Sequence, residues 1–193
     1  MNDAEFAQRY YAAWNARDLE AILALYAEDI EFSSPYIAAL GFSPDGGYVV
    51  TTMQDNQLHG WRLKDAKDLR MGGYPSKVRA MSFLSNGQLL ATAGASGAVL
   101  WPFVGANGPM GREATEIGYD EGSLVALVAS QPRHGLLAAG LTDGRVWLAD
   151  PAGQGLNFLK ADKGSPITAL AMSADAKRVA WADEDGNAGV STL

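Results

Sequence analysis

The chain lacks cysteine and contains only two histidines, so several kinds of chemistry are excluded at once. With 0 Cys among 193 residues, it can form no disulfide, thiolate nucleophile or cysteine-based zinc site. No apolar run approaches the roughly 20 residues that a membrane-spanning helix needs, and the N-terminus lacks the basic start of a secretory signal. Because 15 Lys plus Arg stand against 22 Asp plus Glu, no basic surface is expected for nucleic-acid phosphates. We therefore expect a soluble, cytoplasmic protein that binds neither nucleic acid nor membrane.

Four segments share one layout, an apolar stretch followed by a polar turn. They begin at residues 37, 78, 125 and 167, close to the roughly 40–45-residue spacing of propeller blades. A repeat of short strands cannot bury its apolar face alone, so neighbouring repeats must pack together. The expected strands are 37–42, 48–53, 58–63 and 69–71, then 78–83, 89–93, 98–101 and 114–117, then 125–130, 136–140, 145–148 and 156–159, and last 167–172, 178–182 and 188–191. The pattern predicts a mainly β protein, a partial or small β-propeller of about four blades.

The segment before residue 37 follows a helical pattern. Apolar side chains recur every three or four residues, at Phe6, Tyr10, Ala13 and Trp14, which predicts an amphipathic helix. Asp18 is a good N-cap for a second helix, and residues 30–32 alternate like a strand that could complete the last repeat. We expect two domains: a helical hairpin with a short strand at 1–36, and the blades at 37–193.

The first repeat carries a recognisable motif. The runs FSPDG at 42–46 and DNQLHGW at 55–61 resemble a WD repeat, and the resemblance extends in degenerate form over about residues 37–193. It implies a propeller whose loops bind proteins or peptides. It also implies that three aspartates at equivalent places brace the turn between the second and third strands: Asp55, Asp143 and Asp185.

The N-terminal segment carries a second resemblance. The runs FAQRYYAAWNARDL at 6–19 and LYAEDIEF at 25–32 resemble the opening of the nuclear transport factor-like cone fold, which includes SnoaL-type proteins. The resemblance covers about residues 3–36. In that family two N-terminal helices lie against a curved sheet, and later elements complete a ligand pocket. It implies an alternative function, a SnoaL-like small-ligand-binding protein or enzyme with a pocket reached by Trp14 and Tyr26.

No catalytic or metal-binding signature is complete. The acidic run 183–187 begins like a calcium loop, but its Gly comes early and no Glu follows at the twelfth position. His59 and His134 lie in repeats rather than in a catalytic motif. We therefore expect no catalytic residue, no cofactor, no metal and no enzyme activity.

The favoured function is a non-catalytic WD-repeat-type interaction scaffold. The four repeats could close as a small ring, form a homodimer in which a second copy completes a larger ring, or be a truncated or fused piece of a longer propeller. The partner would be a protein or peptide. Its candidate contacts are Trp61, Arg79, Tyr119 and Arg133.

Overall fold

The computed structural model describes residues 3–16, 18, 21, 37–153 and 155–193. The chain divides into two compact units, Met1–Ser34 and Pro35–Leu193. The first contains helix α1 (Asp3–Ala16), in which Ala13 is buried. After it, the Asp18 carboxylate accepts a hydrogen bond from the Ala21 N–H at 3.0 Å, as expected of a helix N-cap. The body of the second helix and the short strand at 30–32 lie outside the described residues, so the helical hairpin is not shown.

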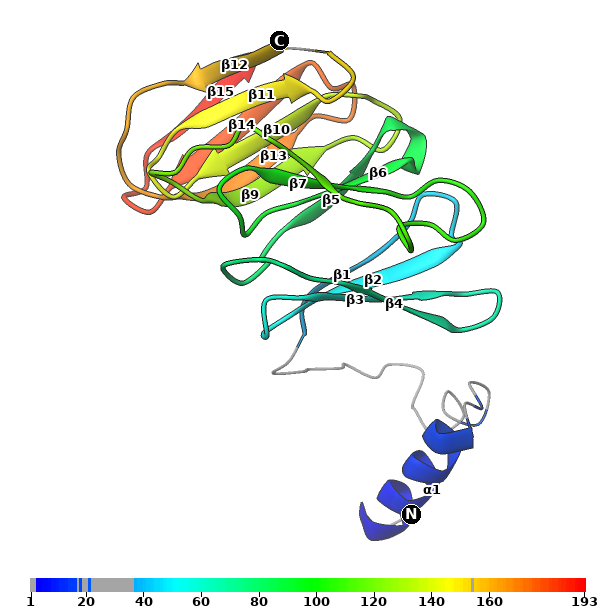
Figure 1. Ribbon diagram of the computed structural model, residues 1–193. Coiled ribbons are helices and arrows are strands. Elements are labelled where there is room, and N and C mark those ends of the chain that lie inside the picture. The colour runs from blue at the N-terminus through cyan, green and yellow to red at the C-terminus, as the bar shows by residue number, and fades with distance from the viewer. Residues whose placement is uncertain (1–2, 17, 19–20, 22–36, 154) are drawn as a thin grey trace. The chain divides into compact units, whose positions relative to one another are not determined.

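The second unit consists of four separate antiparallel sheets whose strands follow chain order (Figure 1). Sheet 1 contains β1 (Ile37–Phe42), β2 (Tyr48–Met53), β3 (Leu58–Arg62) and β4 (Lys67–Met71). Sheet 2 contains β5 (Met81–Leu84), β6 (Leu89–Thr92), β7 (Ala98–Pro102) and β8 (Thr115–Ile117), with a short 3-10 turn, η1 (Ser85–Gly87), between β5 and β6. Sheet 3 contains β9 (Val125–Ser130), β10 (Leu137–Leu141), β11 (Val146–Asp150) and β12 (Gly155–Lys160). Sheet 4 contains β13 (Ile167–Met172), β14 (Arg178–Asp183) and β15 (Ala188–Thr192).

A serine-aspartate turn sets the first hairpin of sheet 1. The Ser43 hydroxyl donates to the Asp45 carboxylate at 2.5 Å and accepts the Tyr48 N–H at 2.9 Å. Side chains that bond their own turn in this way favour a chain reversal over a continued strand. The Ser43 hydroxyl and the Gly47 N–H also lower the pKa of Asp45. The local sequence therefore fixes where β1 ends and β2 begins.

The core lies between consecutive sheets. Each sheet has a front face and a back face. The back face of sheets 1 to 3 packs on the next sheet in chain order, and the front face of sheets 2 to 4 packs on the previous one. The front face of sheet 1 and the back face of sheet 4 are the remaining two. Sheets 1 and 2 share a cluster that includes Val50, Leu58, Phe83 and Leu90. Sheets 2 and 3 share one with Leu84, Leu137 and Trp147, and sheets 3 and 4 share one with Ala138, Met172 and Val179. Among the described residues, no hydrophobic cluster joins sheet 4 to sheet 1.

The structure confirms the mainly β class and most of the expected strands, but not the four-bladed propeller. The strands predicted at 37–42, 48–53, 125–130 and 167–172 have the predicted bounds. The sheets, however, form a row that is not closed. The reason is physical: repeat length fixes how many strands each unit can hold, whereas closure depends on the angle at which sheets pack, which the period does not encode.

In the described part of the chain, no helix is both long and apolar enough to cross a membrane.

Candidate functional site

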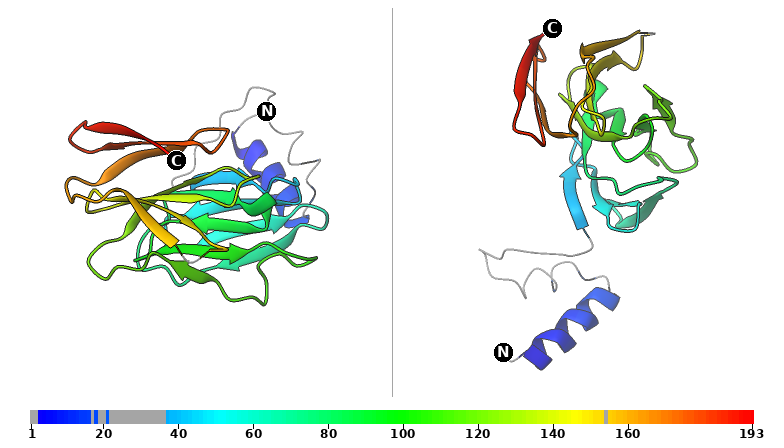
Figure 2. Two further views of the ribbon diagram at one scale, coloured as in Figure 1. Left: turned by 90° about the horizontal axis from the view of Figure 1, so that it is seen from above. Right: turned by 90° about the vertical axis from the view of Figure 1, so that its left-hand side faces the viewer.

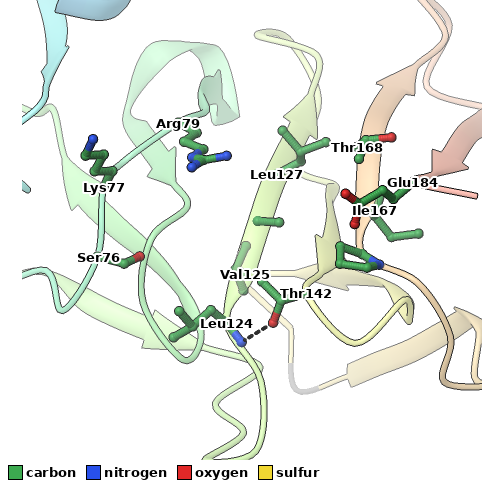
Figure 3. Close-up of a pocket in the computed structure, with 12 residues that line it drawn as sticks. Ser76, Lys77, Arg79, Leu124, Val125, Leu127, Thr142, Ile167, Thr168 and Glu184 are labelled. Atoms are coloured by element: carbon green, nitrogen blue, oxygen red, sulfur yellow. Dashed lines mark hydrogen bonds between the residues drawn. The ribbon is translucent and has the colours of Figure 1, made fainter.

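A cavity of about 670 Å³ lies where sheets 2, 3 and 4 approach one another (Figure 3). Its floor is formed by the start of β9, including Val125 and Leu127. On one side of this floor lies the connection between β4 and β5, which supplies Lys77 and Arg79, and on the other lie β13 and Glu184. The cavity therefore combines an apolar floor with a cationic side and an acidic side.

Backbone hydrogen bonds build the walls in the same way in two neighbouring sheets. In sheet 3 the Thr142 N–H donates to the Leu124 carbonyl at 2.9 Å, and in sheet 4 the Glu184 N–H donates to the Pro166 carbonyl at 2.9 Å. Each bond ties the residue after the second strand to the residue before the first. Thr142 Oγ1 also accepts the Leu124 N–H at 3.0 Å (Figure 3). Thr142 and Glu184 thus occupy equivalent places at the cavity.

Gly94 holds the cationic wall against β9. Its N–H donates to the Val125 carbonyl at 2.9 Å, and its carbonyl accepts the Ser76 hydroxyl at 2.9 Å. Its φ of +97° is rarely adopted by other residues, and an added Cβ would lie 3.1 Å from the Lys77 carbonyl oxygen. Glycine at this position therefore lets the segment that carries Lys77 and Arg79 lie close to the floor.

The charged side chains of the cavity are available to a ligand. Lys77, Arg79 and Glu184 are exposed, and none of them belongs to the ion pairs found among the described residues. The floor is different, since its apolar side chains Leu124 and Leu127 are half-buried. An apolar body could rest on this floor while polar groups at its ends meet charges of opposite sign.

Of the four predicted interaction residues, Arg79 alone lines this cavity. Trp61 lies on β3, where its ring contacts that of His59 with 4.0 Å between ring centroids and a tilt of 43° between the ring planes. Tyr119, in the connection between β8 and β9, is 62% exposed, and Arg133 is exposed in the turn between β9 and β10. The cavity therefore does not bring the four together, and their role as an interaction surface stays a prediction.

The three predicted turn aspartates occupy equivalent turns but make different contacts. Asp143 accepts hydrogen bonds from the Arg145 side chain at 2.8 Å and from its N–H at 3.3 Å. Burial alone would raise the pKa of Asp143, but these bonds lower it overall. Asp185 accepts the Ser165 hydroxyl at 2.5 Å, whereas Asp55 has no hydrogen bond within the described part of the chain.

The acidic run at 183–187 forms a hairpin turn. Asp183 accepts the Asn187 N–H at 2.9 Å and the Asn187 side-chain amide at 3.2 and 3.1 Å, and these bonds lower the pKa of Asp183. No group of three or more potential metal ligands was found among the described residues.

Sequence reasoning missed most of the cavity. Lys77, Thr142, Ile167 and Glu184 were not predicted as site residues. A signal for them exists: each lies just before the first strand of a repeat, at its start, or just after its second strand. Because the repeats share one register, these positions converge at one end of the packed sheets.

The comparisons with known proteins give a family match and similar solved structures. Residues 7–52 match the model of the SnoaL-like domain, which is about a quarter of the 193 residues. No curated protein matches the chain. The crystal structure of the computationally designed Ika4 protein is similar, with a TM-score of 0.65 and 21% identity, over 86% of this chain and 96% of that one. At this identity the similarity shows the fold alone.

These findings correct the WD-repeat recognition. The matched segment contains most of the N-terminal stretch that resembles SnoaL-type proteins and continues through β1 into β2. The WD-repeat recognition assigned β1 and β2 to the first WD repeat instead. No WD-repeat evidence accompanies it, and the sheets do not close. The recognition of residues 37–193 as a WD-repeat propeller is therefore wrong, and the scaffold function loses its main support. Of the two functions considered, the findings favour the SnoaL-like, small-ligand alternative.

Proposed function

We propose that the protein binds a small organic ligand in the cavity between sheets 2, 3 and 4. Two observations support this. Residues 7–52 match the SnoaL-like domain, a family with a ligand pocket, and the cavity of about 670 Å³ falls in the range of roughly 300–1,000 Å³ for small-molecule sites. The matched segment itself contributes no lining residue. The main support for ligand binding is that the cavity has an apolar floor between unpaired charges of opposite sign.

The charges define the ligand class. A guanidinium can grip a carboxylate or phosphate through two parallel hydrogen bonds, so Arg79, with Lys77 beside it, suits an anionic group. An apolar body would cover the exposed parts of Leu124 and Leu127, and a hydroxyl or amine would donate to Glu184. We infer a small hydroxy- or amino-carboxylate, or phosphate ester, with an alkyl or aryl body.

The expectation that the chain is not an enzyme stays a prediction. The SnoaL-like match makes an enzyme a second candidate, and Glu184 supplies the cavity's carboxylate. A carboxylate beside a bound ligand can act as a general base or acid. If so, Glu184→Gln would preserve binding and abolish turnover of whichever ligand is bound.

Calorimetry with a panel of alkyl and aryl hydroxy-carboxylates tests the proposal. We expect at least one member to bind with a Kd below about 1 mM, and Arg79→Ala to weaken it about tenfold or more because a charge-assisted pair is lost. Arg133→Ala is the matched control: it removes the same side chain from an exposed turn outside the cavity and leaves the Kd unchanged. The proposal fails if no member binds, or if the two variants behave alike.

A further inference from the structure

Sheets 1 and 4 are the first and the last of the four sheets (Figure 2). Each has an apolar face that no other described sheet covers. On the front face of sheet 1, Leu40 is 58% and Phe42 61% exposed. On the back face of sheet 4, Val190 is 67% exposed, and the alanines around it are exposed as well, at positions Ala169, Ala171, Ala180 and Ala188. Contiguous apolar faces of this kind mark interaction surfaces.

The two end sheets are built to one plan. The β1–β2 and β13–β14 pairs have the same register, and both contain an irregularity at the same place, between Ile37 and Ala39 in one and between Ile167 and Ala169 in the other. Each residue of the first three strands of sheet 1 therefore has its equivalent 130 positions further on, as Ile37 and Ile167 show.

The first turn of sheet 4 also repeats that of sheet 1. The Ser173 hydroxyl donates to Asp175 at 2.6 Å and accepts the Arg178 N–H at 3.0 Å, as Ser43 does in the first sheet. Since turn and register agree, equivalent side chains lie on equivalent faces.

The uncovered front face of sheet 1 is thus the counterpart of a buried one. Phe42 and Val49 pair with each other, as their equivalents Met172 and Val179 do in sheet 4. Met172 and Val179 are only 7% and 0% exposed, because they pack on the small side chains of sheet 3, including Ala138.

The same holds in reverse for the back faces. Val50 and Leu58 of sheet 1 are each 0% exposed, because sheet 2 covers them. Their equivalents on sheet 4, Ala180 and Ala188, are exposed. Each end sheet therefore lacks the neighbour that its equivalent possesses.

We infer that a second copy of this chain supplies both missing neighbours. The back face of sheet 4 in one copy packs on the front face of sheet 1 in the other, so Phe42 rests on the alanines as Met172 does on Ala138. Each contact joins two different faces, and the reciprocal contact between the same two copies makes the interface as a whole isologous. Two copies related by a two-fold axis make two such contacts and leave neither face open.

This surface is separate from the proposed ligand site. Lys77 and Arg79 belong to neither uncovered face, so the failure of either proposal leaves the other testable.

Light scattering on the full chain measures the assembly. We expect a mass of twice the 20.4 kDa of one chain. Phe42→Asp alters one face and Val190→Asp the other, and each should give the mass of one chain, with the dimer Kd raised at least about a hundredfold because a charge is buried without a partner. Leu63→Asp is the control: Leu63 is 48% exposed in the turn between β3 and β4, and its variant stays dimeric.

A mixing experiment tests the head-to-tail arrangement and the folding of the variants together. In a mixed pair, one contact combines both altered faces and the other combines two native faces. Equal amounts of Phe42→Asp and Val190→Asp should therefore regain the mass of two chains, which neither regains alone. A wild-type mass of one chain, a mass above two chains, a dimer that survives either substitution, or no recovery on mixing would overturn the inference.

Discussion

Sheets 1 and 4 share turn, register and irregularity, yet they bury opposite faces. Sheet 1 buries its back face, where Val50, Leu58, Leu69 and Met71 lie at 0% to 1% exposure. Sheet 4 buries its front face with Met172 and leaves a back face mostly of alanine uncovered. The comparison separates two kinds of information: short-range bonds such as those of Ser43 fix the backbone plan, whereas the neighbouring sheet decides which face is covered. The predictions below test this separation.

The largest effect is expected from the two faces of sheet 1. Leu58→Ala removes a side chain with 0% exposure and should lower the free energy of unfolding by about 2–5 kcal/mol. Leu40→Ala, at 58% exposure, should cost less than about 1 kcal/mol in the single chain, because exposed sites contribute little. Urea unfolding of dilute protein measures both. Equal losses would show that the front face is covered within one chain.

A smaller effect is expected at Gly60 and its equivalent, Val190. A Cβ on Gly60 would lie 2.8 Å from the Val49 carbonyl oxygen, so Gly60→Ala should destabilise the fold by about 1–3 kcal/mol through forced backbone shifts. Val190→Gly, on the uncovered face, should cost no more than about 1 kcal/mol, the ordinary penalty of glycine in a strand. Thermal unfolding of both variants checks the order, and a larger loss at Val190 would contradict the equivalence.

The shared turn should contribute similarly in both sheets. Ser43→Ala and Ser173→Ala each remove a hydroxyl that bonds both the aspartate and a backbone N–H of its turn, and each should cost about 1 kcal/mol. The loss at Ser43 should be the larger, because Ser43 is 5% exposed and the polar groups that it leaves are further from water. Denaturant unfolding at neutral pH measures both, and a negligible loss at both positions would refute the role of the turn.

The smallest effect is a dependence on pH at the same turns. The Ser43 and Ser173 hydroxyls, each with a backbone N–H, lower the pKa of Asp45 and Asp175 below the ordinary value of an aspartate. A lowered pKa means stability that is present above about pH 4 and is lost as the pH falls through the folded value. Asp45→Asn should therefore be less stable than wild type at pH 6 and approach it as the pH falls through the lowered pKa of Asp45. A difference that does not change with pH would refute this.

The strands were predictable because their information is local. Alternating apolar residues and polar turns located 37–42 and 167–172 to the residue. The strand expected at 78–83 instead begins at Met81. The residues before it lie along the cavity wall, where Val78 is buried in the core and Arg79 lines the cavity. A buried apolar residue in a connection looks like part of a strand, so the period placed this start too early.

The cavity and the arrangement of sheets were not predictable by the same route. Lys77 and Glu184 lie more than a hundred residues apart and line the same cavity because the sheets pack side by side. The repeat register marks their equivalent positions, but no local pattern shows that a cavity lies between them. The N-terminal resemblance did point to the family that matches, but the repeat pattern outweighed it and favoured a scaffold. Arg79 was predicted as an interaction residue on the surface, but the sequence did not show that an apolar cavity floor lies beside it.

The matched family segment ends at residue 52, one position before the end of β2. A gene fragment cut at that limit would keep the β1–β2 hairpin and discard β3, the strand whose Gly60 pairs with Val50. An isolated two-stranded hairpin is marginally stable in water, and its side chains that are buried in the full chain would become exposed apolar surface that favours aggregation. The limits of the family match therefore do not coincide with the limits of the sheets, and recombinant fragments should be cut at the gaps between sheets.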